Sequence, residues 1–284
     1  MCKTKRFAPI SVRWLAEFRK TLKQSNVRQW LKGSKMDQKY WYLKNCDLFS
    51  RLSSSQIAHI ESCSVAKNYD RGGVVYLPSD RNDSVALLAR GRVRIYHLTQ
   101  EGKQAVLAIM DPGEMFGELS LMSDGHRDEF AEAMDKSTVI LIPREEILGL
   151  MAEYPDVALG VSRLMGFRRQ RVERRLKSLL FRSNRERLVH LLLELASKYG
   201  EQAEEGIRIG IKLSHQELAN IIGSTRETVT VLLGELQSEG SLLIRRRQLI
   251  LTKLNRLADS IDAPIPALPQ TTPFVFRKPV PGLV

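Results

Sequence analysis

The sequence predicts an α+β fold in which a module of short strands, one long helix and a second, mainly helical domain follow each other. Three observations predict this order. Short apolar runs separated by Gly, Pro and Asn-Asp turns fill residues 68–142. Residues 157–181 contain no proline and place an apolar residue every three to four positions. Residues 214–233 show the pattern of two short helices joined at a glycine.

The composition is that of a packed globular protein. The chain has 284 residues, of which 43% are hydrophobic and 27% charged, and this length allows two ordinary domains. It contains no apolar run of about eighteen residues and no secretory signal, which predicts a cytoplasmic protein. Cys2, Cys46 and Cys63 are odd in number and widely spaced, so they predict neither a disulfide framework nor a zinc site.

Positive charge is concentrated in three places. Residues 1–35 hold ten lysines and arginines against one acidic residue, which accounts for +9 of the net charge of +12. Seven arginines lie between Arg163 and Arg182, and three more form residues 245–247. Basic residues gathered on particular elements are typical of a surface that contacts phosphates. For residues 1–35 two interpretations stay open. They are a basic extension with a short helix around Trp14 and Trp30, or an upstream addition to a protein that starts at Met36.

The first half of the chain is predicted to be a helix followed by strands. Residues 47–67 have the apolar spacing of a helix, and the serines at 53–55 are candidate N-caps. Alternating or continuous apolar runs then predict strands. These runs are residues 74–77, 85–88, 93–96, 105–109 and 139–142.

Residues 155–182 are predicted to form one long helix, with Pro155 suited to its first turn. Its apolar stripe is typical of a two-helix interface, although packing against the strand module is the alternative. Arg168 interrupts this stripe. The stripe residues are Val161, Met165, Val172, Leu176 and Leu179.

The most informative stretch is residues 214–233, which predicts a helix-turn-helix. Ser214 and Glu217 form a capping box, and Gly223 allows the turn. A helix is predicted before it, ending near Gly200, and a strand at 207–213. A basic hairpin wing is predicted after it, at 242–251. The predicted DNA-binding residues are Ser214, His215, Gln216, Ser224, Thr225, Arg226, Glu227, Thr230, Arg245, Arg246 and Arg247.

Three of these residues are expected to lie on the outward face at the start of the second helix, which enters the major groove in this motif. Arg226 suits guanine O6 and N7, and Glu227 suits cytosine N4, each contact contributing about 1–3 kcal/mol of base discrimination. Thr230 is the third. The motif predicts a protein that binds double-stranded DNA in a sequence-specific way.

The order of these parts, with residues 116–121 and 223–229, resembles the CRP/FNR family of bacterial transcription regulators. The resemblance implies a jelly-roll-like β-roll, a homodimer formed through the long helix, and promoter binding that recruits or blocks RNA polymerase. Family members often have a further base-reading arginine where this chain has Val231, which leaves the inner base preference open. The implied divisions are a basic extension (1–35), a cyclic-nucleotide-binding-like sensor domain (36–154), a dimerisation helix (155–182), a winged helix-turn-helix domain (183–258) and a proline-rich disordered tail (259–284).

The resemblance also implies a ligand pocket, and the sequence departs from the family there. Asp128 replaces a neutral donor, and a carboxylate about 4 Å from a cyclic phosphate would repel it by up to ~4 kcal/mol at a dielectric near 20. Val172 and ionised Glu173 cannot donate to the base. We therefore predict a regulator that does not need cAMP, with Arg127 paired to Asp128, Glu118 or another acidic neighbour. The pocket residues are Gly117, Glu118, Leu119, Ser120, Arg127, Asp128, Val172 and Glu173.

Other functions are weighed against this one. A regulator activated by cAMP or another small ligand is the first alternative, and a module that binds a ligand or protein without DNA is the second. No nucleophile–base pair, metal cluster or P-loop is recognisable, so an enzyme is not expected. Three scattered cysteines cannot supply the four ligands of an iron–sulfur cluster. Lone histidines (His59, His97, His126) do not predict haem, and redox sensing by Cys46 and Cys63 has no support.

Overall fold

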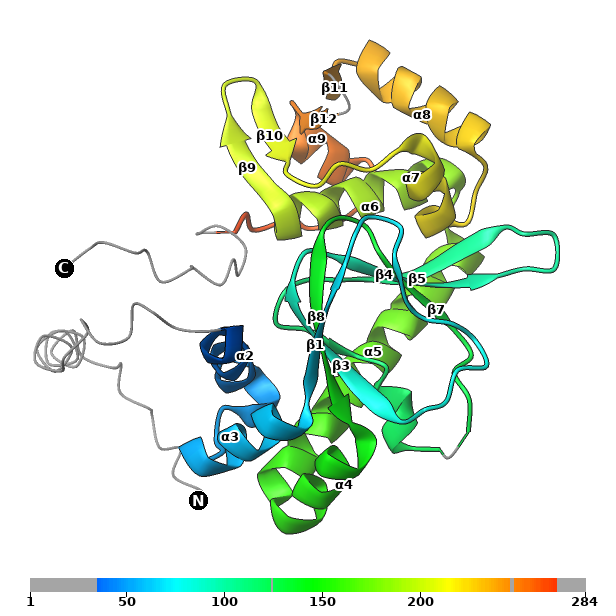
Figure 1. Ribbon diagram of the computed structural model, residues 1–284. Coiled ribbons are helices and arrows are strands. Elements are labelled where there is room, and N and C mark those ends of the chain that lie inside the picture. The colour runs from blue at the N-terminus through cyan, green and yellow to red at the C-terminus, as the bar shows by residue number, and fades with distance from the viewer. Residues whose placement is uncertain (1–34, 124, 246–247, 270–284) are drawn as a thin grey trace, which may run out of the picture. The chain divides into compact units, whose positions relative to one another are not determined.

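The computed structural model describes residues 35–123, 125–245 and 248–269, and the described residues from Lys39 onward belong to one compact unit (Figure 1). The expected helix around Trp14 and Trp30 lies outside the described residues, as do Arg246 and Arg247. Among the described helices, none is both long and apolar enough to cross a membrane.

Helices open the described part of the chain. They are α2 (Lys35–Lys44), a 3-10 turn (Asp47–Phe49) and α3 (Ser54–Cys63). Ser53 caps α3 and exchanges hydrogen bonds with Gln56 in a capping box, as the serine run predicted. The single helix predicted for residues 47–67 is wrong at both ends. Residues from Val65 onward pair with a distant strand, and this pairing overrides the local helical spacing.

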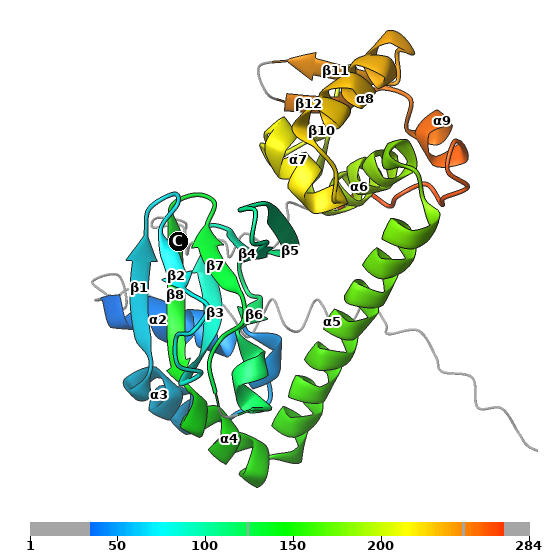
Figure 2. The same cartoon turned by 90° about the vertical axis from the view of Figure 1, so that its right-hand side faces the viewer.

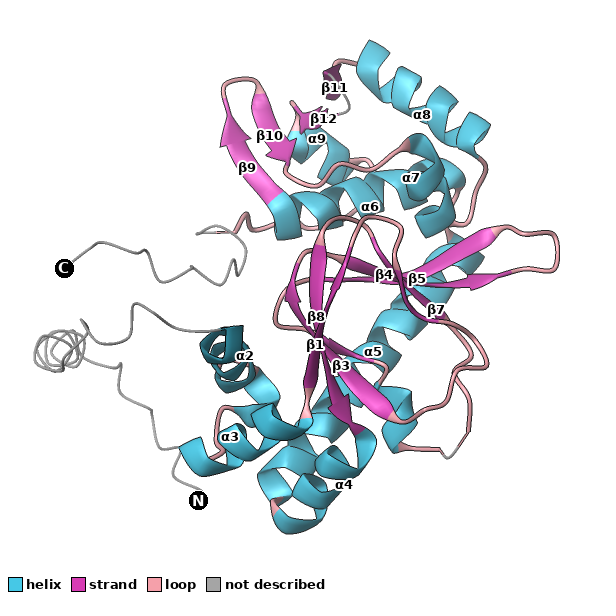
Figure 3. Cartoon of the chain, in the orientation of Figure 1, coloured by secondary structure: helices cyan, strands magenta, loops and turns pink. Residues whose placement is uncertain are grey.

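The sensor domain consists of two antiparallel four-stranded sheets (Figure 3). One has the order β1-β8-β3-β6 and the other β2-β7-β4-β5. Every strand expected from an apolar run is present, whereas β1 and the charged β7 carry no such run. The strands are β1 (Val65–Tyr69), β2 (Val74–Tyr76), β3 (Ser84–Arg90), β4 (Val93–Leu98), β5 (Gln104–Met110), β6 (Met115–Phe116), β7 (Phe130–Ala133) and β8 (Ser137–Pro143).

Strand β3 is apolar along most of its length because both of its faces are covered. Ala86 and Leu88 contribute to a core cluster that also contains β4 and β7 residues. Val85 and Leu87 point the other way, into a cluster that includes Phe49, Ile60 and Ile147 from the helical elements. A strand covered on both faces is continuously hydrophobic rather than alternating, as the run at 85–88 is.

Two helices follow the sensor sheets: α4 (Arg144–Glu153) and α5 (Pro155–Phe181). Figure 2 shows α5 as one unbroken helix. Pro155 occupies its first turn, where the missing N–H has no intrahelical partner to lose. Its first half packs on the sensor domain, because Val161 is fully buried in the cluster of Phe49 and Ile60.

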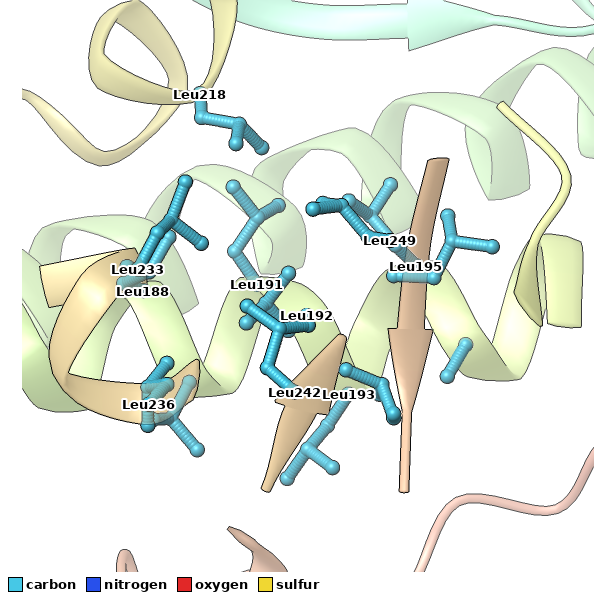
Figure 4. Packing of buried hydrophobic residues seen from close by; sticks show 14 of the residues in the cluster. Leu188, Leu191, Leu192, Leu193, Leu195, Leu218, Leu233, Leu236, Leu242 and Leu249 are labelled. Carbon is cyan, nitrogen blue, oxygen red and sulfur yellow. The ribbon is translucent and has the colours of Figure 1, made fainter. Parts of the chain in front are cut away.

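The C-terminal domain combines helices with a sheet of order β11-β12-β10-β9. Leucines from α6, α7, α8 and the wing strands converge in its core (Figure 4). The elements are α6 (Asn184–Tyr199), β9 (Gly200–Ala203), β10 (Gly206–Ile209), α7 (His215–Ile222), α8 (Arg226–Ser238), β11 (Leu242–Arg245), β12 (Gln248–Leu251) and α9 (Leu254–Asp259).

The segment after α9 departs from the disordered tail predicted to begin at residue 259. The Ser197 hydroxyl donates to the Ala267 carbonyl oxygen at 3.2 Å, and Leu268 packs against the C-terminal core. These contacts anchor an irregular, proline-containing segment that has no secondary structure of its own up to residue 269. Residues 270–284 lie outside the described part.

Candidate DNA-binding surface and ligand pocket

The helix-turn-helix is built by side chains that close the ends of its two helices. The Ser214 hydroxyl accepts from the Glu217 backbone N–H, and the Glu217 carboxylate accepts from the Ser214 N–H at 2.7 Å. Gly223 ends α7 in the left-handed region, at φ 67°. Thr225 then caps α8 by accepting from the Thr228 N–H at 3.2 Å. These caps fix where α8 begins, and so which residues form its exposed N-terminal turn.

The N-terminal face of α8 is exposed and chemically suited to reading bases. Arg226, Glu227 and Thr230 are all exposed, whereas Val229 and Leu233 are fully buried and anchor the helix. Hydrogen bonds from its own backbone N–H and from the Thr225 hydroxyl hold the pKa of Glu227 below its usual value. At neutral pH its carboxylate is therefore only an acceptor, as a contact to cytosine N4 requires.

Three of the predicted DNA-binding residues, His215, Gln216 and Thr230, also make hydrogen bonds within the motif. His215 Nδ1 and Thr230 Oγ1 lie 2.8 Å apart and join α7 to α8. The Thr230 hydroxyl also donates to the Arg226 carbonyl oxygen at 2.8 Å. Gln216 donates to the Asn220 side-chain oxygen on its own helix at 2.8 Å. The sequence did not reveal the His215–Thr230 contact, because it depends on the crossing of two helices.

The basic residues do not all face outward. Arg245 is exposed on the wing, but its guanidinium pairs with Glu205 at 2.7 Å. On α5, Arg168 and Arg175 turn inward, and Arg175 donates to the Val106 carbonyl oxygen. Burial lowers the pKa of Arg175. These two arginines of the run between 163 and 182 therefore point into the protein and not toward a phosphate-contacting surface.

The pocket motif lies between β6 and a 3-10 turn (Glu118–Leu121). Gly117 has φ 72°, and a Cβ at this position would stand 2.5 Å from the Arg127 guanidinium. Glycine is therefore required both by its backbone conformation and by the close approach of Arg127. The hydroxyl of buried Ser120 donates to the Ser84 carbonyl oxygen at 3.4 Å, whereas Leu119 is exposed.

Arg127 does not form the acidic pair that we predicted for it. Its hydrogen bonds run to the Ser84 carbonyl oxygen at 2.6 Å and to the Gly117 carbonyl oxygen at 3.5 Å. Its guanidinium lies 4.0 Å from the centre of the Tyr76 ring, in a cation–π contact. The contacts of this buried cation are therefore carbonyl oxygens and an aromatic face, not a carboxylate.

The acid of the pocket pairs with α5 instead. Glu118 is 2% exposed and forms an ion pair with Arg168, which also donates to the Met115 carbonyl oxygen. Burial raises the pKa of Glu118, and the Arg168 charge opposes this rise. The sequence signal for this contact is an arginine inside an apolar helical stripe. We interpreted it only as an interruption of that stripe. A buried carboxylate needs such a partner.

The remaining pocket residues are not gathered around Arg127. Asp128 is exposed, so solvent screens its charge, and it is Glu129 that accepts from the Tyr76 hydroxyl at 2.8 Å. Burial and Glu129 raise the pKa of Tyr76. Val172 is exposed, and Glu173 is exposed and accepts from Arg169 on the same helix at 2.9 Å.

The predicted dimer residues fall into two groups along α5. Val161 is buried in the sensor core and Met165 packs against the same cluster, so contacts within the chain account for both. Val172, Leu176 and Leu179 are 65%, 54% and 42% exposed. Their spacing of four and then three residues places them on one face of the helix. The C-terminal half of α5 thus presents an apolar face that this chain leaves open.

Comparisons with known proteins agree with this architecture. The family model for the cyclic nucleotide-binding domain matches residues 66–154, and that for the Crp-like helix-turn-helix domain matches residues 186–260. A global nitrogen regulator of Synechocystis sp. is 33% identical over 65% of this chain and 83% of its own length. A CRP-like cAMP-activated global transcriptional regulator of Mycobacterium tuberculosis is 26% identical over 76% of this chain and 96% of its own.

Solved structures give the same result. A CRP/FNR-family transcriptional regulator of Thermus thermophilus is 27% identical, with a TM-score of 0.57 over 70% of this chain and 99% of that one. The β-roll, the long helix and the winged helix-turn-helix occur here in the order seen in such regulators. The chain belongs to the CRP/FNR family of DNA-binding transcription regulators.

Proposed function

We propose that this regulator works as a homodimer, binds palindromic promoter sites through α8 and does not need cAMP to do so. The observation that carries the DNA-binding part is the exposed pair Arg226 and Glu227 at a capped helix N-terminus. Its bidentate donor and its ionised acceptor are the two chemistries that discriminate G·C pairs in the major groove.

Homodimer formation is supported by the open apolar face of α5. Val172, Leu176 and Leu179 lie at the spacing that lets two helices interdigitate, and a monomer would leave them in water. A two-fold dimer of α5 places two copies of α8 in symmetric positions. Symmetric recognition helices read a palindrome, with half-site centres about 34 Å apart on the duplex. Bound there, the dimer acts by recruiting or blocking RNA polymerase.

Independence from cAMP is supported by the contacts of the pocket. To bind a cyclic phosphate, Arg127 must give up the Ser84 carbonyl oxygen and the face of Tyr76. An incoming hydroxyl group must donate to the Glu118 carboxylate, which already accepts from Arg168. Glu129, which accepts from the hydroxyl of the Tyr76 ring that lies against Arg127, adds a negative charge that would repel an incoming anion.

A second candidate is activation by cAMP. It is favoured by the presence of Gly117, Glu118 and Arg127 in the motif, and by the similarity to the cAMP-activated regulator of Mycobacterium tuberculosis. Calorimetric titration separates the two candidates. Under our proposal cAMP binds more weakly than about 10 µM, which corresponds to less than about 7 kcal/mol of binding free energy. Tighter binding would contradict it.

The DNA-binding proposal is tested by Arg226→Ala on a site selected from a random duplex pool. Because the dimer makes this contact in both half-sites, its loss should cost about 2–6 kcal/mol, weaken the selected site by about thirtyfold or more and relax its preference at one position of each half-site. The matched control is Arg256→Ala, an exposed arginine on α9. Fluorescence anisotropy at fixed salt measures both variants. Equal losses for the two would show that α8 contributes only charge.

A further inference from the structure

Three metal-ligand side chains meet at the outer surface of the sensor domain, away from the pocket and the recognition helix. His59 and Cys63 lie four residues apart on α3, and Glu146 lies in the first turn of α4. One ligand atom of each, a His nitrogen, the Cys sulfur and a carboxylate oxygen, lies within 4.8 Å of the others. Both views place α3 beside α4 (Figures 1 and 2). We propose that these residues bind Zn²⁺.

Two of the three distances between ligand atoms lie close to those of a tetrahedral ion. With zinc bonds of about 2.0–2.3 Å, ligand atoms of such a site stand roughly 3.4–3.6 Å apart. His59 Nε2 lies 3.0 Å from Glu146 Oε2, and Cys63 Sγ lies 3.9 Å from His59 Nε2. Small side-chain rotations that move the ligand atoms by a few tenths of an ångström would bring both distances into this range. The i,i+4 spacing already places His59 and Cys63 on the same face of α3.

The backbone beneath the ligands is fixed by the core. Ile60 follows His59, Ile147 follows Glu146, and both isoleucines are fully buried in the same cluster. A capping box at Ser53 holds the start of α3. The two helices therefore bring the three ligands together before any ion binds, so little ordering entropy opposes binding.

The donor set selects the type of cation. One thiolate, one imidazole and one carboxylate are ligands for a borderline-soft divalent ion rather than for Mg²⁺ or Ca²⁺, which prefer oxygen alone. Thiolate and carboxylate charges together balance the ion's two positive charges. The His59 side chain is 64% exposed, so the ion has an entry path and water can take the fourth position.

The wide spacing of the three cysteines predicts no zinc site, because cysteine spacing shows nothing of ligands from other residue types. The third ligand here comes from Glu146, 87 residues after His59, and only the fold places it beside α3.

The test uses the full-length protein stripped with a chelator and titrated with Co²⁺, followed by displacement with Zn²⁺. A near-ultraviolet thiolate-to-cobalt band should grow to saturation at one ion per chain and vanish on displacement. Cys63→Ser should abolish the band. His59→Asn and Glu146→Gln should weaken Zn²⁺ binding by at least about a hundredfold, since losing even an outer partner costs about 10–100-fold.

Two matched controls keep the test decisive. Glu145→Gln changes the neighbouring exposed carboxylate, which pairs with Arg144, and should leave the band and affinity unchanged. Cys46→Ala removes the buried thiol of the same domain and should also leave the band in place. Thermal melts confirm that each variant folds. A missing band in the native protein, or a band that survives Cys63→Ser, would overturn the proposal.

Discussion

Replacing Leu176 by alanine should weaken the proposed dimer by a predictable amount. Complete burial of a leucine side chain contributes about 2 kcal/mol. Since Leu176 is 54% exposed in the single chain, a partner helix can still bury about half of it. This contributes about 1 kcal/mol for each chain and about 2 kcal/mol for a symmetric dimer, in which the contact occurs twice. The dimer dissociation constant should rise by roughly thirtyfold.

The matched control for this variant is Phe167→Ala. Phe167 is 67% exposed and lies nine residues before Leu176, which at about 100° per residue places it on the opposite face of α5. Sedimentation velocity over a concentration series measures both dissociation constants. Weakening by Leu176→Ala alone is the expected result. Equal effects of both variants, or no effect of either, would refute the assignment of the dimer face.

Three further predictions concern the folded chain. Ser214→Ala removes the cap of α7 and should lower the free energy of unfolding by about 1 kcal/mol, measured by urea denaturation; an unchanged midpoint would contradict the capping box. Gly117→Ala should cost more, because its Cβ meets Arg127 at 2.5 Å, and a melting temperature equal to that of the native protein would argue against this packing. Burial, and after it the charge of Arg182, lowers the pKa of His190 below 6.5. As the pH falls below about 6.5 the unfolded chain therefore binds the proton before the folded chain does, and the free energy of unfolding decreases. His190→Gln should flatten this decrease, measured by thermal melts between pH 7 and 5.

Much of the fold follows from local pattern in the sequence. The caps at Ser53 and Ser214 join residues three positions apart, and local apolar runs and a proline-free stretch predict the sensor strands and α5. Such local patterns are visible in a single sequence. The start of α8, and with it the exposure of Arg226 and Glu227, could be predicted for the same reason.

What the sequence did not predict depends on contacts between distant segments. The first three residues of β1 were assigned to a helix because their pairing with β8 cannot be seen locally. The partner of Arg127 was expected among carboxylates, whereas backbone carbonyl oxygens and the Tyr76 ring provide its contacts. Glu118 lies 50 residues from Arg168, so this ion pair too was invisible to local reasoning.

The most direct test of the account is the affinity of the full-length protein for its selected palindrome, measured at fixed salt with and without saturating cAMP. The account predicts tight binding with the same dissociation constant in both conditions, since Arg127 and Glu118 already have partners within the chain. Binding that appears only when cAMP is added would contradict it. That result would show that cAMP displaces the Ser84 and Tyr76 contacts and that the pocket works as a cAMP switch.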